Sequence, residues 1–116
     1  MSQVIDLKDA LERVQDDKEL LLELFDIFIE DFGGKRNGFW KAFENHDLVP
    51  FQQIAHGLKG ATGNISAAQM HENCINLDHM GKEGNIQDAR PALELLDKQF
   101  ADFKIEAARL KVEFAK

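Results

Sequence analysis

Apolar residues recur at intervals of three and four along most of the chain, which is the spacing of amphipathic helices. No stretch alternates apolar and polar residues between turn residues, so β-strands are not expected. A short first helix is predicted from Leu7 to Val14, with Asp6 placed to cap its N-terminus. The pattern therefore predicts an all-α protein that opens with a short helix.

A longer helical pattern begins near Asp17 or Lys18 and continues through Phe43. Gly33 and Gly34 interrupt this pattern, and each glycine costs about 1 kcal/mol relative to alanine inside a helix. The segment is therefore compatible with one weakened long helix or with two helices.

Two further helices are predicted on either side of a turn at Ser66. Pro50 suits the first turn of the earlier helix, because a proline there needs no backbone N–H. Ser66 and Gln69 have the spacing of a capping box, so the later helix is expected to begin near Ala67. This later helix is expected to end near the loop of residues 81–84.

The last predicted helix has Asn85 as its candidate cap and continues to Phe114. Its apolar positions alternate between three- and four-residue steps, which is typical of left-handed bundle packing. Pro91 is expected to kink its first turns. Together the pattern predicts an antiparallel, up-and-down four-helix bundle with a short extra N-terminal helix, in a single domain over residues 1–116.

Composition restricts the class of protein further. The chain has 116 residues, of which 44% are hydrophobic and 30% are charged, as in a globular protein. It has no signal peptide and no apolar run long enough to span a bilayer, so we expect a cytoplasmic monomer without membrane contact. The net charge of −7 and the absence of a Lys/Arg cluster argue against nucleic-acid binding.

The candidate chemistry lies on the predicted helix of residues 51–66. Helical geometry turns His56 away from the apolar stripe, and Lys59 and Gly60 follow it at the i+3 and i+4 positions of the same face. Lys59 would place a fixed positive charge beside the imidazole, where it could neutralise phosphoryl oxygens. Gln52 lies one turn before His56 on this face.

Three glycines lie inside this predicted helix, where glycine is unfavourable. Gly57, Gly60 and Gly63 together cost roughly 2–3 kcal/mol of helix propensity relative to alanine, and such costs are expected where function requires them. At Gly60 and Gly63 the missing side chains would let the backbone of a second protein approach His56. Gly57 projects in a different direction, so we expect it to serve helix packing.

The segment AHGLKGATGNISA, residues 55–67, resembles the signature of histidine phosphotransfer (HPt) domains. The predicted helix order is similar over nearly the whole chain. In that family the histidine is phosphorylated, the lysine lies beside the phosphoryl group and the glycine clears space for the partner. The resemblance implies these roles for His56, Lys59 and Gly60, and it places Gly63 and Gln52 on the docking face.

Two positions depart from the family pattern. The family often has glycine at the position of Ser66. In some members a polar side chain on the following helix, commonly glutamine, holds the other imidazole nitrogen, and the matching position here is Asp78. A carboxylate at that position could orient the ring and raise its pKa, or it could repel an incoming phosphoryl group.

The resemblance implies a phosphocarrier in a multistep two-component phosphorelay. His56 would accept a phosphoryl group from a receiver-domain aspartyl phosphate and pass it to another receiver aspartate. The receiver would supply Mg²⁺, and this chain would need no cofactor of its own. Because the sequence has no Gly-rich nucleotide loop, autonomous kinase activity is not expected, although the domain could belong to a hybrid sensor histidine kinase.

Two other functions compete with this interpretation, namely a metal-binding four-helix bundle and a non-catalytic helical scaffold. Di-iron bundles use Glu-x-x-His motifs, but none of the four histidines has a glutamate three residues before it, and no metal site is predicted. His46, His71 and His79 are expected at the surface or at helix edges. Cys74, the single cysteine, is expected to be a buried and unreactive thiol.

Overall fold

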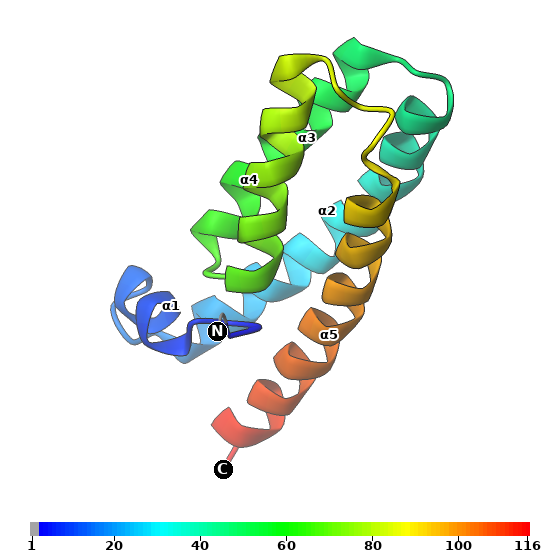
Figure 1. The fold of residues 1–116 in the computed structure, drawn as a ribbon. Helices are drawn as coiled ribbons and strands as arrows, with labels where there is room; N and C mark the ends of the chain where they lie inside the picture. The colour runs from blue at the N-terminus through cyan, green and yellow to red at the C-terminus, as the bar shows by residue number, and fades with distance from the viewer. Residues whose placement is uncertain (1–2) are drawn as a thin grey trace.

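The computed structural model describes residues 3–116, and all of its regular structure in that range is helical. Figure 1 shows the chain as a long bundle with α1 beside the start of α2. The helices are α1 (Leu7–Arg13), α2 (Lys18–Glu44), α3 (Leu48–Asn64), α4 (Ala68–Glu83) and α5 (Arg90–Phe114). The predicted bundle with a short N-terminal helix is therefore confirmed.

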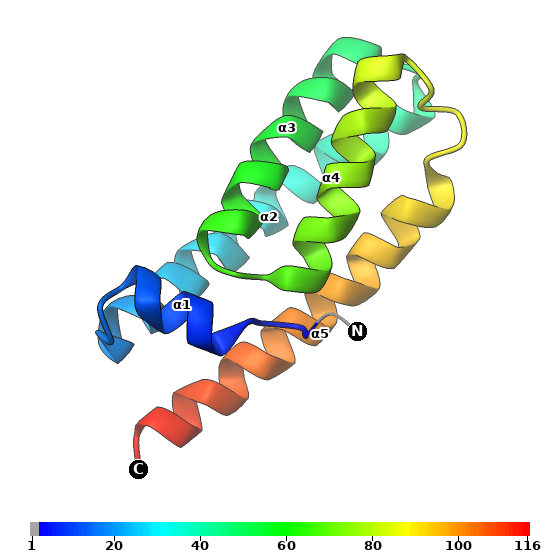
Figure 2. The same cartoon turned by 60° about the vertical axis from the view of Figure 1, so that its left-hand side comes forward.

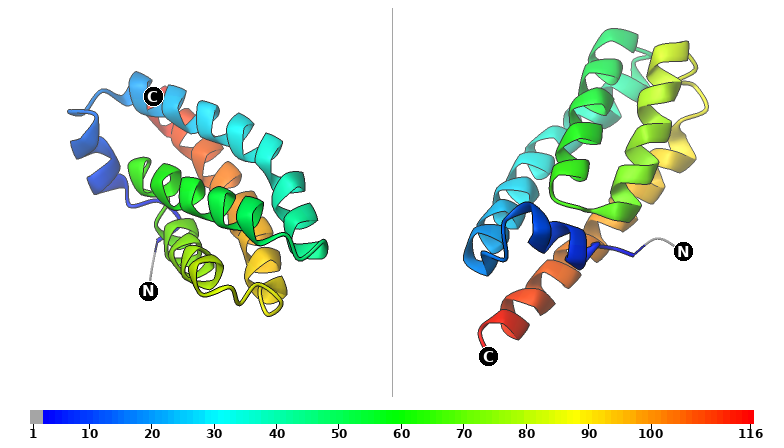
Figure 3. Two further views of the ribbon diagram at one scale, coloured as in Figure 1. Left: turned by 90° about the horizontal axis from the view of Figure 1, so that it is seen from above. Right: turned by 90° about the vertical axis from the view of Figure 1, so that its left-hand side faces the viewer.

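The four long helices pack in the order of an up-and-down bundle. α3 contacts both α2 and α4, and α5 contacts both α4 and α2, so the four helices close a ring. Figure 3 shows the bundle from above and from one side. α2 and α5 are longer than the α3–α4 hairpin and extend past it at one end. None of the helices in residues 3–116 is long and apolar enough to cross a membrane.

Aromatic rings fill the contact between α2 and α5. The ring of Phe103 on α5 is fully buried and meets the rings of Phe25 and Phe28 on α2 edge-on, at centroid distances of 5.4 and 5.2 Å. Phe32 packs against Phe100 at 4.2 Å. This aromatic cluster anchors the two long helices on the side of the bundle away from the α3–α4 hairpin.

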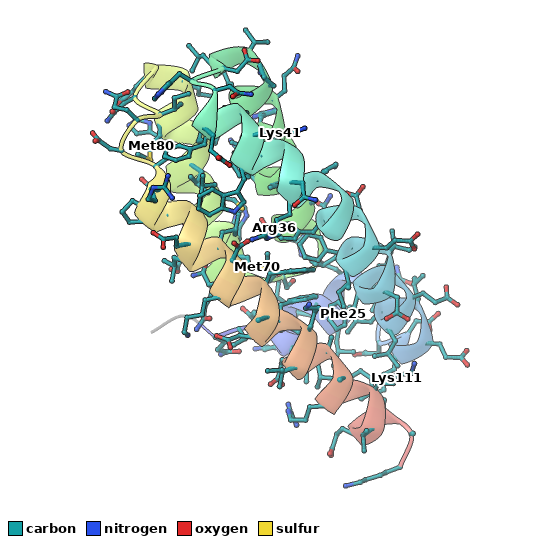
Figure 4. The ribbon with its side chains drawn as sticks, turned by 90° about the vertical axis from the view of Figure 1, so that its right-hand side faces the viewer. Phe25, Arg36, Lys41, Met70, Met80 and Lys111 are labelled. Carbon is teal, nitrogen blue, oxygen red and sulfur yellow. The ribbon has the colours of Figure 1, made fainter. Side chains whose placement is uncertain are left out.

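A polar cross-link joins the same two helices nearer to the hairpin. Arg36 on α2 lies between α2 and α5 in Figure 4. Its guanidinium donates two hydrogen bonds of 2.7 Å to the two carboxylate oxygens of Asp97 on α5. The indole N–H of Trp40 donates to the same carboxylate at 3.1 Å. Bidentate Arg–carboxylate pairs have a defined geometry, so this contact fixes the register of α2 against α5.

The glycine pair at Gly33 and Gly34 does not interrupt α2, which is one continuous helix of 27 residues. Both glycines are exposed, and a Cβ at either would meet nothing within 4 Å. The buried aromatic face on both sides of the pair supplies the packing that overrides their low helix propensity.

The predicted capping box at Ser66 and Gln69 is wrong. The cap residue of α4 is Ala67, and no side chain bonds to the first turn as a cap. The hydroxyl of Ser66 instead donates to Oδ2 of Asp9 on α1 at 2.6 Å, and the Ser66 carbonyl accepts from the N–H of Asp6 at 2.9 Å. Ser66 therefore attaches α1 to the α3–α4 turn.

Ser66 also has a positive φ of 58°, a conformation that favours glycine. This backbone angle is a physical reason for a glycine at the position in related domains. In this chain the hydrogen bond to Asp9 offsets part of the cost of placing a serine there.

The predicted start of the last helix at Asn85 is also wrong, because α5 begins at Arg90 after the cap residue Ala89. The N–H of Asn85 bonds to the carbonyl of Met80 at 3.0 Å, so this residue closes α4 behind the left-handed Gly84. Pro91 lies in the first turn of α5, where its missing N–H is not needed, so the predicted kink has no cause.

We predict that Phe103→Ala lowers the free energy of unfolding by about 3–5 kcal/mol, because the substitution leaves a cavity beside Phe25 and Phe28. The control is Ile105→Ala on the same helix, where the side chain is 69% exposed and the expected change is within about 0.5 kcal/mol. Chemical denaturation measures both. Equal losses in the two variants would contradict the proposed core.

Candidate functional site

The imidazole of His56 stands in solvent on the outer face of α3, as the helical spacing predicts. Its side chain is 66% exposed, whereas Phe51, Ala55 and Leu58 on the opposite face of the helix are fully buried. Figure 2 shows α3 and α4 side by side, with the outer face of the hairpin free of other helices. A second protein can therefore reach the ring without any opening of the bundle.

A buried carboxylate lies directly behind this ring. Asp78 on α4 has a side chain that is only 4% exposed, and its Oδ1 lies 3.4 Å from Nδ1 of His56. The other oxygen, Oδ2, accepts hydrogen bonds from Nζ of Lys59 at 2.9 Å and approaches Nζ of Lys82 at 3.1 Å. The structure thus brings together three predicted site residues, His56, Lys59 and Asp78, from two helices.

The charge state of Asp78 follows from two opposing effects. Burial penalises the carboxylate, but hydrogen bonds and charge attraction from Lys59 and Lys82 outweigh that penalty and hold the pKa of Asp78 below its ordinary value. Asp78 is therefore ionised at neutral pH. Its Oδ1 is the only buried side-chain oxygen or nitrogen in residues 3–116 without a hydrogen-bond partner.

The distance of 3.4 Å from His56 Nδ1 is longer than a formed N–H···O bond. Bonds of this kind are often long in a resting site and shorten when the substrate binds. Oδ1 of Asp78 is buried and unsatisfied, and an Nδ1–H on His56 would give it a donor. The geometry therefore favours the tautomer in which Nε2 carries the free lone pair and faces solvent.

Lys82 is a site residue that the sequence reasoning missed. It lies one turn after Asp78 on α4, and its side chain is 52% exposed. The i,i+4 spacing of an aspartate and a lysine was a visible signal, but that spacing is common on helix surfaces and has no functional meaning by itself. Only the packing of α4 against α3 brings this lysine to the His56 face.

Two shallow hollows flank the imidazole. One has a volume of 420 Å³ and is lined by Val49, Gln52, Gln53, His56 and Lys82. The other has a volume of 530 Å³ and is lined by Arg13, Lys59, Gly60, Gly63, Asn64, His71 and Ile75. The predicted docking residues therefore lie on both sides of the phosphoacceptor candidate, and α1 adds Arg13 to the second hollow.

The glycines of α3 differ in their surroundings. Gly60 is exposed, and a Cβ there would meet nothing within 4 Å, so the surface beside Lys59 is open. Gly57 is equally open, so the prediction that it serves helix packing is wrong. A Cβ on Gly63 would lie 3.0 Å from Cε1 of His71, so Gly63 has a packing role, and its docking role stays a prediction.

A fourth glycine, Gly81 on α4, was not singled out in the sequence. A Cβ there would lie 3.2 Å from Cα of Gln52 on α3. The missing side chain lets α4 approach α3 closely, one turn from Asp78. Gly81 therefore sets the helix separation on which the contact between Asp78 and His56 depends.

Two of the other histidines, His71 and His79, and the cysteine have structural surroundings. Nδ1 of His71 lies 2.9 Å from the carbonyl of Lys59, and the exposed His79 pairs with Glu83 on its own helix. Cys74 is fully buried, and burial raises the pKa of its thiol to about 12, as expected for an unreactive cysteine. No group of metal-ligating side chains gathers anywhere in the described part of the chain.

The fold is an antiparallel helical bundle in which α3 carries the exposed His56 beside Lys59. The sequence profile of the Hpt domain family matches residues 23–107, and the chain belongs to this family. Its role is therefore histidine phosphotransfer in a phosphorelay, as a phosphocarrier and not a kinase, and response-regulator receiver domains are the partners that the family implies.

A solved structure has the same fold. The histidine-containing phosphotransfer protein B (HptB) of Pseudomonas aeruginosa PAO1 superposes with a TM-score of 0.81 at 22% sequence identity. The alignment covers 94% of this chain and 98% of that protein. No curated protein sequence matches the chain significantly.

We predict that Gly60→Ala and Gly81→Ala change stability differently. Alanine at position 60 gains up to about 1 kcal/mol of helix propensity without any contact, whereas at position 81 the new methyl group presses on the backbone of Gln52. The Gly81 variant should be less stable than the Gly60 variant by about 1 kcal/mol or more in chemical denaturation. Equal stability of the two variants would show that α3 and α4 are not in close contact at this point.

Proposed function

We propose that His56 is the phosphoacceptor, which takes a phosphoryl group from the aspartyl phosphate of one receiver domain and passes it to an aspartate of another. The observation that supports this most directly is an exposed imidazole whose Nδ1 faces a buried, ionised carboxylate. That arrangement leaves Nε2 as an oriented and accessible nucleophile.

The transfer balances without an external proton. The lone pair of His56 Nε2 attacks phosphorus, the bond between phosphorus and the receiver aspartate breaks, and that aspartate leaves as a carboxylate. Nδ1 keeps its proton, so the phosphorylated ring carries a positive charge. The carboxylate of Asp78 stabilises this cation, and the reverse step returns a neutral imidazole when the phosphoryl group moves to the next receiver.

Other residues act on the phosphoryl oxygens and on the partner. Lys59 neutralises negative charge next to the ring, and the open surface at Gly60 admits the partner backbone, with Gln52 and Gly63 at the edges of the contact. The receiver supplies Mg²⁺ in its own acidic pocket, so this chain needs no cofactor. We further propose that the domain acts as a cytoplasmic monomer, either alone or within a hybrid sensor kinase.

We predict that His56→Gln abolishes labelling when the protein is incubated with receivers charged by acetyl phosphate. The label on the wild-type chain should be acid-labile and alkali-stable, as expected for a phosphohistidine. His79→Gln is the matched control, because His79 on α4 has an almost equal exposed fraction of 67%. Retention of the label in the His56 variant would refute the assignment, and a binding-only scaffold would show no label in any variant.

We also predict that Gly60→Arg weakens binding to a receiver by at least about tenfold, which corresponds to 1.4 kcal/mol. The long side chain would occupy the open surface on which the partner docks. Gly33→Arg on α2 is the control, since a Cβ there also meets nothing within 4 Å. Calorimetric titration measures both affinities, and an unchanged affinity of the Gly60 variant would exclude this docking face.

A further inference from the structure

Two ammonium groups share one carboxylate oxygen beside His56. Oδ2 of Asp78 lies 2.9 Å from Nζ of Lys59 and 3.1 Å from Nζ of Lys82. The lysines approach from different helices, Lys59 from α3 and Lys82 from α4. Oδ1 of the same carboxylate has no hydrogen-bond partner among the described residues. Two lysine charges therefore face the single negative charge of Asp78, so the site carries one excess positive charge.

The position of Lys82 suggests a use for the excess positive charge. Its side chain is 52% exposed, so an anion that arrives from solvent can reach the ammonium group. Lys82 and His56 line the same hollow of 420 Å³ with Gln52 and Gln53, which precede His56 on α3, whereas Lys59 and Gly60, which follow His56, line the other hollow. A phosphoryl group on Nε2 would project from between these two hollows, with one lysine on each side.

We propose that Lys82 is a second ligand of the phosphoryl group, and that phosphorylation exchanges the ion pairs of the site. This inference rests on the proposed function of His56. Before transfer, Lys59 and Lys82 are paired with Asp78. After transfer, both ammonium groups turn to the phosphoryl oxygens, and Asp78 pairs with the cationic ring of His56 through its free Oδ1.

The charges of the two states support this exchange. A phosphoryl group carries a charge of up to about −2 at neutral pH, and phosphorylation makes the imidazole ring cationic. In the phosphorylated state the negative charges of Asp78 and the phosphoryl group are then balanced by the positive charges of the ring and the two lysines. Without Lys82 the site would keep one unbalanced negative charge, in a chain whose net charge is already −7.

The experiment uses phosphoramidate, a small donor that phosphorylates histidine nitrogens, so that receiver docking does not influence the result. The full chain is compared with the variants Lys82→Gln, Lys82→Arg and Lys98→Gln. Lys98 is the matched control, because it also forms an i,i+4 ion pair, with Asp102 at 3.2 Å, but lies on α5. Phosphorus NMR follows both the rate of phosphorylation and the titration of the bound phosphoryl group.

Loss of Lys82 should slow phosphorylation by about tenfold and raise the pKa of the phosphoryl group by roughly half a unit or more. Arginine at this position should restore both values, and Lys98→Gln should change neither. A lysine that only held Asp78 in place would leave the phosphoryl pKa unchanged, so this titration separates a direct contact from a structural role.

Two results would overturn the inference in different ways. In the first, the wild-type chain is phosphorylated on His56, but Lys82→Gln and Lys98→Gln have the same rate of phosphorylation and the same phosphoryl pKa. Lys82 is then not a phosphoryl ligand, and the proposed function stands. In the second, His56 of the wild-type chain acquires no phosphate, so the proposed function fails and the inference fails with it.

Discussion

A carboxylate removed from water must be paired, and the pairing of Asp78 determines the geometry of the functional face. Its side chain is 4% exposed and lies between α3 and α4, where it contacts one lysine from each helix and faces the ring of His56. Both helices must keep their register and separation for these contacts to form. Gly81 has no side chain and so allows the two helices to lie this close, because any larger residue there would press on Gln52.

The rest of the bundle holds this hairpin without covering it. The aromatic contacts between α2 and α5, together with the ion pair of Arg36 and Asp97, stabilise the opposite side of the molecule. Ser66 attaches α1 to the α3–α4 turn through Asp9. The outer face of α3 around His56 and Gly60 is therefore not part of the hydrophobic core, so an exposed histidine and an open glycine cost little stability there.

The bundle architecture and the face that a residue occupies on its own helix could be predicted from the sequence, whereas the side-chain contacts between helices could not. The common face of His56, Lys59 and Gly60 follows from helical spacing alone. The resemblance to a known family indicated the position of Asp78, but its contacts depend on the register of α4 against α3, which also determines the roles of Lys82 and Gly81. The start of α4 near Ala67 was predicted correctly, but its capping box was not, because Ser66 bonds to Asp9 on α1 instead. The start of α5 was predicted wrongly because Asn85 closes α4 through its bond to Met80.

If Asp78 holds the neutral ring of His56, the ring carries its proton on Nδ1 and its lone pair on Nε2. Long-range ¹H–¹⁵N NMR correlation on the uniformly labelled protein, at alkaline pH, identifies the tautomer directly. We expect the Nδ1–H tautomer for His56 and its loss in Asp78→Ala, where the acceptor is gone. A predominant Nε2–H tautomer in the wild-type protein, as in a freely solvated histidine, would show that Asp78 does not orient the ring.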